Sequence, residues 1–120
     1  MSIVEKIGVP ALLEQTAEEC CELAQACLKM ARKLRDENPT PKSVEDIRDN
    51  LIEEMADVHL CRKLLHEADV VSFWEVIPIT VDKEERWKKR LDLHMDLDDE
   101  ETRDSYYPYH KEIEEDDESV

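Results

Sequence analysis

The spacing of apolar residues along the chain predicts three helices separated by breaker residues. The first is expected over residues 10–37, because proline at its first position is preorganised for a helical turn. The second is expected over residues 43–68, where Ser43 is a favourable N-cap with an acidic residue three positions later. The third stretch is β-branched around Pro78 but continues with a charged helical pattern, which predicts a helix to about His94.

The second predicted helix carries two acids inside its apolar arc. Glu54 and Asp57 lie three positions apart, and both point where the core is expected. Two ionised carboxylates directed inward are costly unless a cation or hydrogen bonds compensate them. The apolar arc around them consists of Val44, Ile47, Leu51, Met55, Val58, Cys61, Leu64 and Leu65.

The first predicted helix has an apolar surface that exceeds half of its circumference. Glu19 lies among the flanking residues Leu12, Leu23 and Met30, and Glu22 lies at their border with the polar face. A helix with so wide an apolar surface must contact more than one neighbour, which favours a homodimer or a tetramer. The main apolar stripe consists of Leu13, Ala17, Cys20, Cys21, Ala24, Cys27, Leu28, Ala31 and Leu34.

Acid pairs on two successive helices can gather four carboxylates around a hard divalent cation. Oxygen ligands favour Mg²⁺, with Mn²⁺ or Ca²⁺ as alternatives, over zinc or copper. Such a site usually leaves coordination positions for water and a substrate phosphate, which points to phosphoryl or pyrophosphate chemistry. The alternative is that these acids belong to ordinary solvated faces of acid-rich helices.

Other catalytic chemistries find little support in the sequence. No Glu-x-x-His pair of the kind that di-iron bundles use is present, and no G-x-S-x-G elbow indicates a nucleophilic serine. A single glycine among 120 residues is too few for phosphate-binding glycine loops or for repeated hairpin turns. We therefore expect an all-α fold.

The net charge of −16 is concentrated near the end of the chain. Residues 96–120 hold 12 acids against Arg103 and Lys111, which predicts a largely disordered acidic tail after a domain over residues 1–95. This charge argues against nucleic acid and anionic membranes as partners. It also leaves open a second function class, a noncatalytic helical module whose acidic tail recruits a basic partner.

The first residues lack the layout of a signal peptide, and no apolar run approaches the length of a membrane span. The four cysteines show no C-x-x-C spacing and fit a reducing compartment. We therefore expect a cytoplasmic protein.

Two acid motifs in this order, Glu18-Glu19-x-x-Glu22 followed by Glu54-x-x-Asp57, resemble the EExxE…ExxD signature of MazG-like nucleoside triphosphate pyrophosphohydrolases. The resemblance covers roughly residues 10–90 and implies an antiparallel helical bundle. It also implies Mg²⁺-dependent hydrolysis between the α and β phosphates, which yields a nucleoside monophosphate and pyrophosphate.

By motif position, the resemblance makes Glu19, Glu22, Glu54 and Asp57 the metal ligands. Glu18 and Glu19 would be catalytic, with Glu18 orienting water or a ligand carboxylate. Lys83 and Arg86 match a Lys-x-x-Arg stretch near the end of the family's domain and would hold phosphates, although Val81 stands where the family commonly has asparagine.

Overall fold

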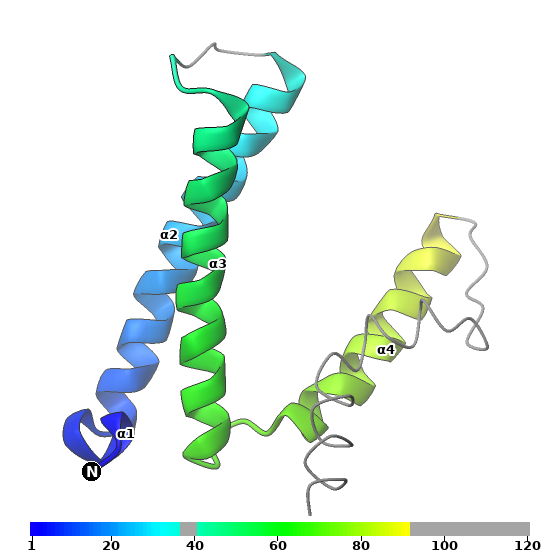
Figure 1. Cartoon of the computed structure of the whole chain (residues 1–120). Coiled ribbons are helices and arrows are strands. Elements are labelled where there is room, and N and C mark those ends of the chain that lie inside the picture. Colours follow the sequence, from blue (N-terminus) through cyan, green and yellow to red (C-terminus); the bar gives the residue numbers. More distant parts are fainter. Residues whose placement is uncertain (37–40, 92–120) are drawn as a thin grey trace, which may run out of the picture. The chain divides into compact units, whose positions relative to one another are not determined.

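The computed structural model describes residues 1–36 and 41–91, and every regular element among them is a helix. The expected all-α class is therefore confirmed for the described residues, whereas the predicted tail and its boundary at residue 96 lie outside them. The chain forms two compact units, Met1–Ser72 and a second that begins at Phe73. The helices are α1 (Ile3–Ile7), α2 (Val9–Arg35), α3 (Val44–Glu67) and α4 (Phe73–Arg90) (Figure 1).

Helix α1 is an additional element that precedes the predicted helices. Ser2 and Glu5 form a capping box, in which the Glu5 amide donates to Ser2 Oγ at 3.1 Å and the Ser2 amide donates to Glu5 Oε2 at 3.0 Å. The chain then turns at Gly8, which has a φ of 85°. Residues with a side chain rarely adopt this backbone conformation. Because this turn ends α1, helix α2 begins at Val9 with proline in its first turn.

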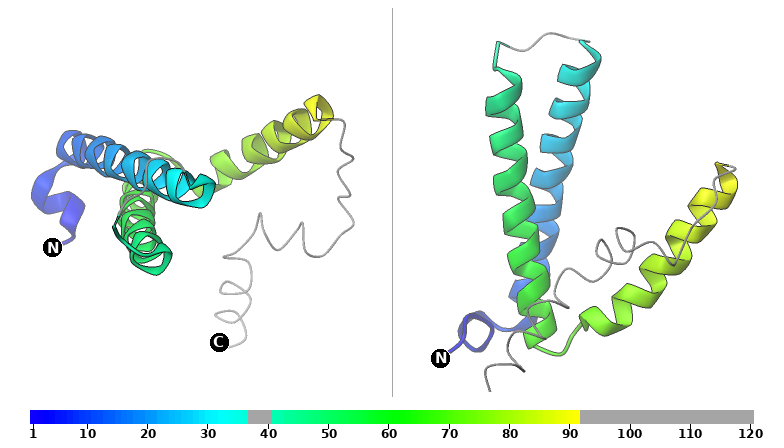
Figure 2. Two further views of the ribbon diagram at one scale, coloured as in Figure 1. Left: turned by 90° about the horizontal axis from the view of Figure 1, so that it is seen from above. Right: turned by 45° about the vertical axis from the view of Figure 1, so that its right-hand side comes forward.

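Helices α2 and α3 end close to where the sequence predicts. Asp36 adopts the left-handed conformation and ends α2 at Arg35, two residues before the predicted end. Ser43 caps α3 as expected, because its hydroxyl accepts a hydrogen bond of 3.1 Å from the Asp46 amide. The two helices run side by side (Figures 1 and 2), and α2 packs along α3.

The core of the first unit lies where the start of α2 meets the end of α3. Leu12 packs with Leu64 and Leu65, and Val4 from α1 joins them at the edge. Residues near the start of one helix therefore contact residues near the end of the other, which makes the pair antiparallel. Further along the interface, Ala26, Ile47 and Cys61 are also buried.

Helix α4 begins at Phe73 and contains Pro78 in its interior. The sequence predicts a helical pattern that includes this proline but does not define where the helix begins, and the structure shows the helix starting five residues before the proline. Proline at the sixth helical position has no amide hydrogen, so the helix forms one backbone hydrogen bond fewer at this point. The helix ends at Arg90, and the predicted end at His94 lies outside the described residues. Among the described helices, none has the length and apolarity needed to span a membrane.

Candidate metal centre

The side of α2 that faces α3 is the one on which Glu19 lies. The buried and half-buried apolar residues on the same side of α2 are Leu12, Leu23, Ala26 and Met30. These are largely the residues that the sequence pattern assigns to the flank of the apolar surface, whereas the main stripe lies elsewhere on the helix. Glu19 is therefore close to the centre of the interface instead of at its edge.

Glu54 occupies the corresponding position on α3. It shares the α2-facing side of the helix with the buried residues Ile47, Cys61 and Leu65. The prediction that Glu54 points toward the core is thus confirmed for the α2–α3 pair. The same prediction for Asp57 is wrong, because Asp57 is exposed at the edge of the interface. The two antiparallel helices bring one glutamate from each into the same layer of the interface.

Four carboxylates meet at this layer. Glu19, Glu22, Glu54 and Asp57 each offer one oxygen atom, and these four atoms lie within 4.8 Å of one another. Glu19 and Glu54 are half-buried between the helices, while Glu22 and Asp57 are exposed. The cluster therefore has a shielded side in the interface and an open side toward solvent.

Two oxygen atoms of the cluster lack any partner within the described residues. Glu19 Oε2 and Glu54 Oε2 are shielded from solvent and accept no hydrogen bond there. An unsatisfied buried polar atom is costly, and an ionised one more so. The other oxygen of Glu19 is satisfied, since Gln15 Nε2 donates to Glu19 Oε1 at 2.7 Å. A cation bound between the helices would coordinate these two oxygens and compensate the cost of burying them.

The electrostatics of Glu19 reflect the crowding of negative charge. The hydrogen bond from Gln15 lowers its pKa, but desolvation and the charges of Asp57 and Glu22 together outweigh that effect. The pKa of Glu19 therefore lies above its ordinary value. A divalent cation would reverse this balance, because it favours the ionised carboxylate.

The donor set is composed of oxygen atoms alone. Carboxylates suit Mg²⁺, Mn²⁺ or Ca²⁺, and the exposed positions of Glu22 and Asp57 leave room for the water molecules that Mg²⁺ retains. The four residues present thus fit a hard divalent cation.

The remaining predicted site residues lie outside this cluster. Glu18 is exposed on α2 and is not one of the four grouped carboxylates. Lys83 and Arg86 are exposed on α4, in the second unit. Gln15 was missed by the sequence argument, although its position four residues before Glu19 places the two side chains on one helix face.

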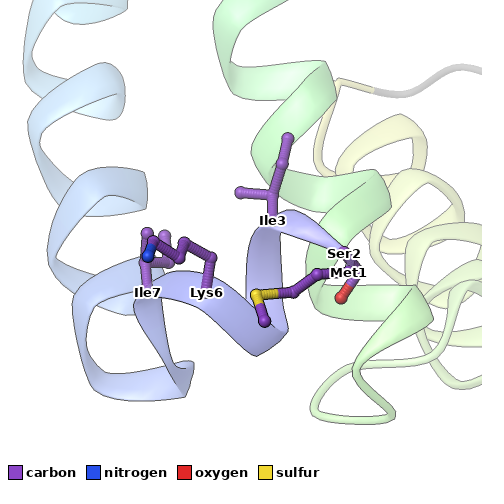
Figure 3. Close-up of a pocket in the computed structure, with 5 residues that line it drawn as sticks. All are labelled: Met1, Ser2, Ile3, Lys6 and Ile7. Carbon is purple, nitrogen blue, oxygen red and sulfur yellow. The ribbon is translucent and has the colours of Figure 1, made fainter.

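A surface hollow of about 440 Å³ lies beside α1. Met1, Ser2, Ile3, Lys6 and Ile7 line it (Figure 3), and it contains none of the clustered acids. The hollow is lined mainly by apolar side chains and one ammonium group, and this set of groups does not form a catalytic site. The carboxylate cluster is therefore the candidate functional site.

No protein-family model, curated protein or solved structure matches this chain.

Proposed function

We propose that this protein is a Mg²⁺-dependent nucleoside triphosphate pyrophosphohydrolase of the MazG-like type. The observation that carries the proposal is the cluster of four carboxylates from two helices, in which two shielded oxygens accept no hydrogen bond from the described residues. An ordinary solvated acidic face would keep these groups apart and hydrated. The residues of the cluster are also those that the EExxE…ExxD motif designates as ligands.

Glu19, Glu22, Glu54 and Asp57 would hold the cation. When bound, Mg²⁺ would neutralise part of the charge on the carboxylates and on the phosphate oxygens, and would lower the pKa of a water molecule. Gln15 orients the Glu19 carboxylate through its hydrogen bond, which limits the rotation of that side chain. The exposed carboxylates leave an approach from solvent for a triphosphate.

Two further roles complete the proposal. Glu18, one residue before Glu19, would orient the attacking water or a ligand carboxylate from the exposed side of α2. Lys83 and Arg86 would bind phosphate oxygens; their spacing of three residues puts both cations on neighbouring positions of the α4 surface. The water would attack the α-phosphorus, and pyrophosphate would be the leaving group.

The proposal is tested by measuring pyrophosphate release from a panel of canonical and modified nucleoside and deoxynucleoside triphosphates with Mg²⁺. Glu54→Gln should reduce the rate by at least about 100-fold, because it removes a ligand charge from the interface. Glu53→Gln is the matched control, since Glu53 is exposed on the same helix and outside the cluster. Absence of release from every substrate, or equal rates for the wild type and Glu54→Gln, would contradict the proposal.

A further inference from the structure

Helix α4 has a row of cations on one side of its second half. Lys83, Arg86 and Arg90 are spaced by three and four residues, which places all three on the same side of the helix. The three side chains are exposed, and Trp87, on the same side, is 64% exposed. We call these four residues the cationic face of α4. It presents three positive charges around an aromatic ring.

The three cations of this face form no ion pair within the part of the chain that the structure describes. The two lysines on the other sides of the helix differ in this respect. Lys88 Nζ lies 3.4 Å from Glu84 Oε1, and Lys89 Nζ lies 3.3 Å from Glu85 Oε1. Neighbouring acids of α4 are therefore engaged away from the cationic face. Its charges are left without an acidic partner in a chain whose net charge is −16.

The sequence that follows α4 has the complementary chemistry. Residues 98–101 are four consecutive acids, and the three tyrosines of the chain follow as Tyr106, Tyr107 and Tyr109. Carboxylates form charge-assisted hydrogen bonds with arginine and lysine, and tyrosine rings favour contact with another aromatic ring. We call residues 96–109 the acidic segment; they lie outside the described residues. Its charges and rings match those of the cationic face.

The connection between them is long enough for the acidic segment to turn back along the helix. The cationic face extends over seven residues from Lys83 to Arg90, which is about 10 Å of helix. Residues 92–97 precede the four acids, and six residues of chain can span up to about 20 Å. A tether this short gives an effective concentration on the order of millimolar, which favours even a weak contact.

We propose that the acidic segment of this chain docks on the cationic face of its own α4, with residues 98–101 against Lys83, Arg86 and Arg90. A single exposed ion pair contributes little to stability, so the docking depends on several pairs acting together and on the tether. Exposed charges are screened by salt, and the docking is therefore strongest at low ionic strength.

The docked segment competes with the substrate, a step that rests on the proposed function. That function assigns Lys83 and Arg86 to phosphate oxygens, and carboxylates bind the same cations. A triphosphate must therefore displace the acidic segment before it reaches them. Because a site that is free for only part of the time binds its ligand more weakly in proportion, the segment raises KM. It leaves the four carboxylates that would hold the cation unchanged.

Energy transfer from tyrosine to tryptophan in the full chain measures the docking. The three tyrosines all belong to the acidic segment, and the two tryptophans, Trp74 and Trp87, both belong to α4. The transfer should be efficient at low salt and largely lost in about 1 M salt, where the Debye length is about 3 Å. It should be independent of protein concentration. Transfer that rises with concentration would overturn the proposal, because the acidic segment of a second copy would then occupy the face.

Two double variants with the same change in charge test the position of the docking. Lys83→Gln combined with Arg86→Gln should lose the transfer, whereas Lys88→Gln combined with Lys89→Gln should keep it. Circular dichroism confirms that both variants are helical. Transfer that is unchanged in the first variant, or equally reduced in both, would overturn docking on the cationic face.

The competition is tested with inorganic tripolyphosphate and with a variant of the acidic segment. Tripolyphosphate added without metal should reduce the transfer, and unchanged transfer would refute the competition. In the pyrophosphate assay, Asp98→Asn combined with Asp99→Asn should lower KM at least about 2-fold with kcat unchanged, as expected if the face is occupied half of the time. An equal KM would also refute the competition. If no triphosphate is hydrolysed, the proposed function fails, and the transfer measurements still decide the docking.

Discussion

Glu19 and Glu54 face each other across the interface of α2 and α3, and each has an Oε2 atom that is shielded from solvent and accepts no hydrogen bond from the described residues. The two positions are flanked by buried apolar side chains on both helices. Two like charges in such a place oppose helix packing, and Gln15 satisfies only one oxygen of one of them. The helical pair is therefore expected to be less stable without a cation than with one.

The first prediction concerns this dependence on metal. Adding Mg²⁺ should raise the melting temperature of the wild type, because a ligand that binds the folded state stabilises it by about 2.7 kcal/mol at 100 times its dissociation constant. Asp57→Asn should lose that effect and should be more stable than the wild type without metal, since one repulsive charge is removed. Differential scanning calorimetry with and without chelator measures both. If Mg²⁺ stabilises Asp57→Asn as strongly as the wild type, Asp57 is not a ligand.

The second prediction concerns pH in the absence of metal. The pKa of Glu19 is raised in the folded protein above its ordinary value of 4.5, so the folded state binds this proton more tightly than the unfolded state does. The contribution of Glu19 to stability is therefore favourable below the ordinary pKa and is lost as the pH rises through the raised one. Urea unfolding of the wild type and of Glu19→Gln across this range should show a difference in free energy that changes with pH in this direction. A constant difference would contradict the assignment.

The third prediction concerns Gln15, which holds the Glu19 carboxylate in position. Gln15→Ala should raise the pKa of Glu19 further, because the hydrogen bond that lowers it is lost. It should also weaken binding of Mn²⁺ by about 10-fold, the lower end of what loss of a ligand's hydrogen-bond partner costs. Isothermal titration calorimetry measures the affinity, and Gln25→Ala serves as the control because Gln25 is exposed on the same helix. Equal affinities for the two variants would exclude this role.

The fourth prediction concerns the small core of the first unit. Leu12 is 1% exposed and packs against Leu64 and Leu65, so Leu12→Ala should destabilise the protein by about 2–5 kcal/mol. Leu60→Ala, at a position that is 47% exposed, should cost less than about 1 kcal/mol. Chemical unfolding followed by circular dichroism compares the two. Similar losses for both variants would show that the described packing is not the main source of stability.

Local signals in the sequence were sufficient for most of the helices. The Ser43 cap and the spacing of apolar residues predict α3 correctly, because capping and periodicity depend on neighbours within a few positions. The same reasoning misses the short α1 and does not define the start of α4, because a capping box of two residues and a proline near a helix start are weak signals alone. The four clustered acids were predicted from their spacing, since an interval of three residues keeps both members of a pair on one side of a helix.

The sequence by itself determined the all-α class of the described residues, the two long helices and the identity of the acids that their apolar arcs contain. Only the tertiary structure decided which of the two apolar surfaces of α2 faces α3. A helical wheel gives the angles between residues but not the direction of a neighbouring helix, and α2 has apolar residues in both directions. Packing through Leu12 and Ala26 sets that direction and brings Glu19 opposite Glu54. It leaves their Oε2 atoms without a hydrogen-bond partner among the described residues and exposes the apolar stripe that contains Leu28.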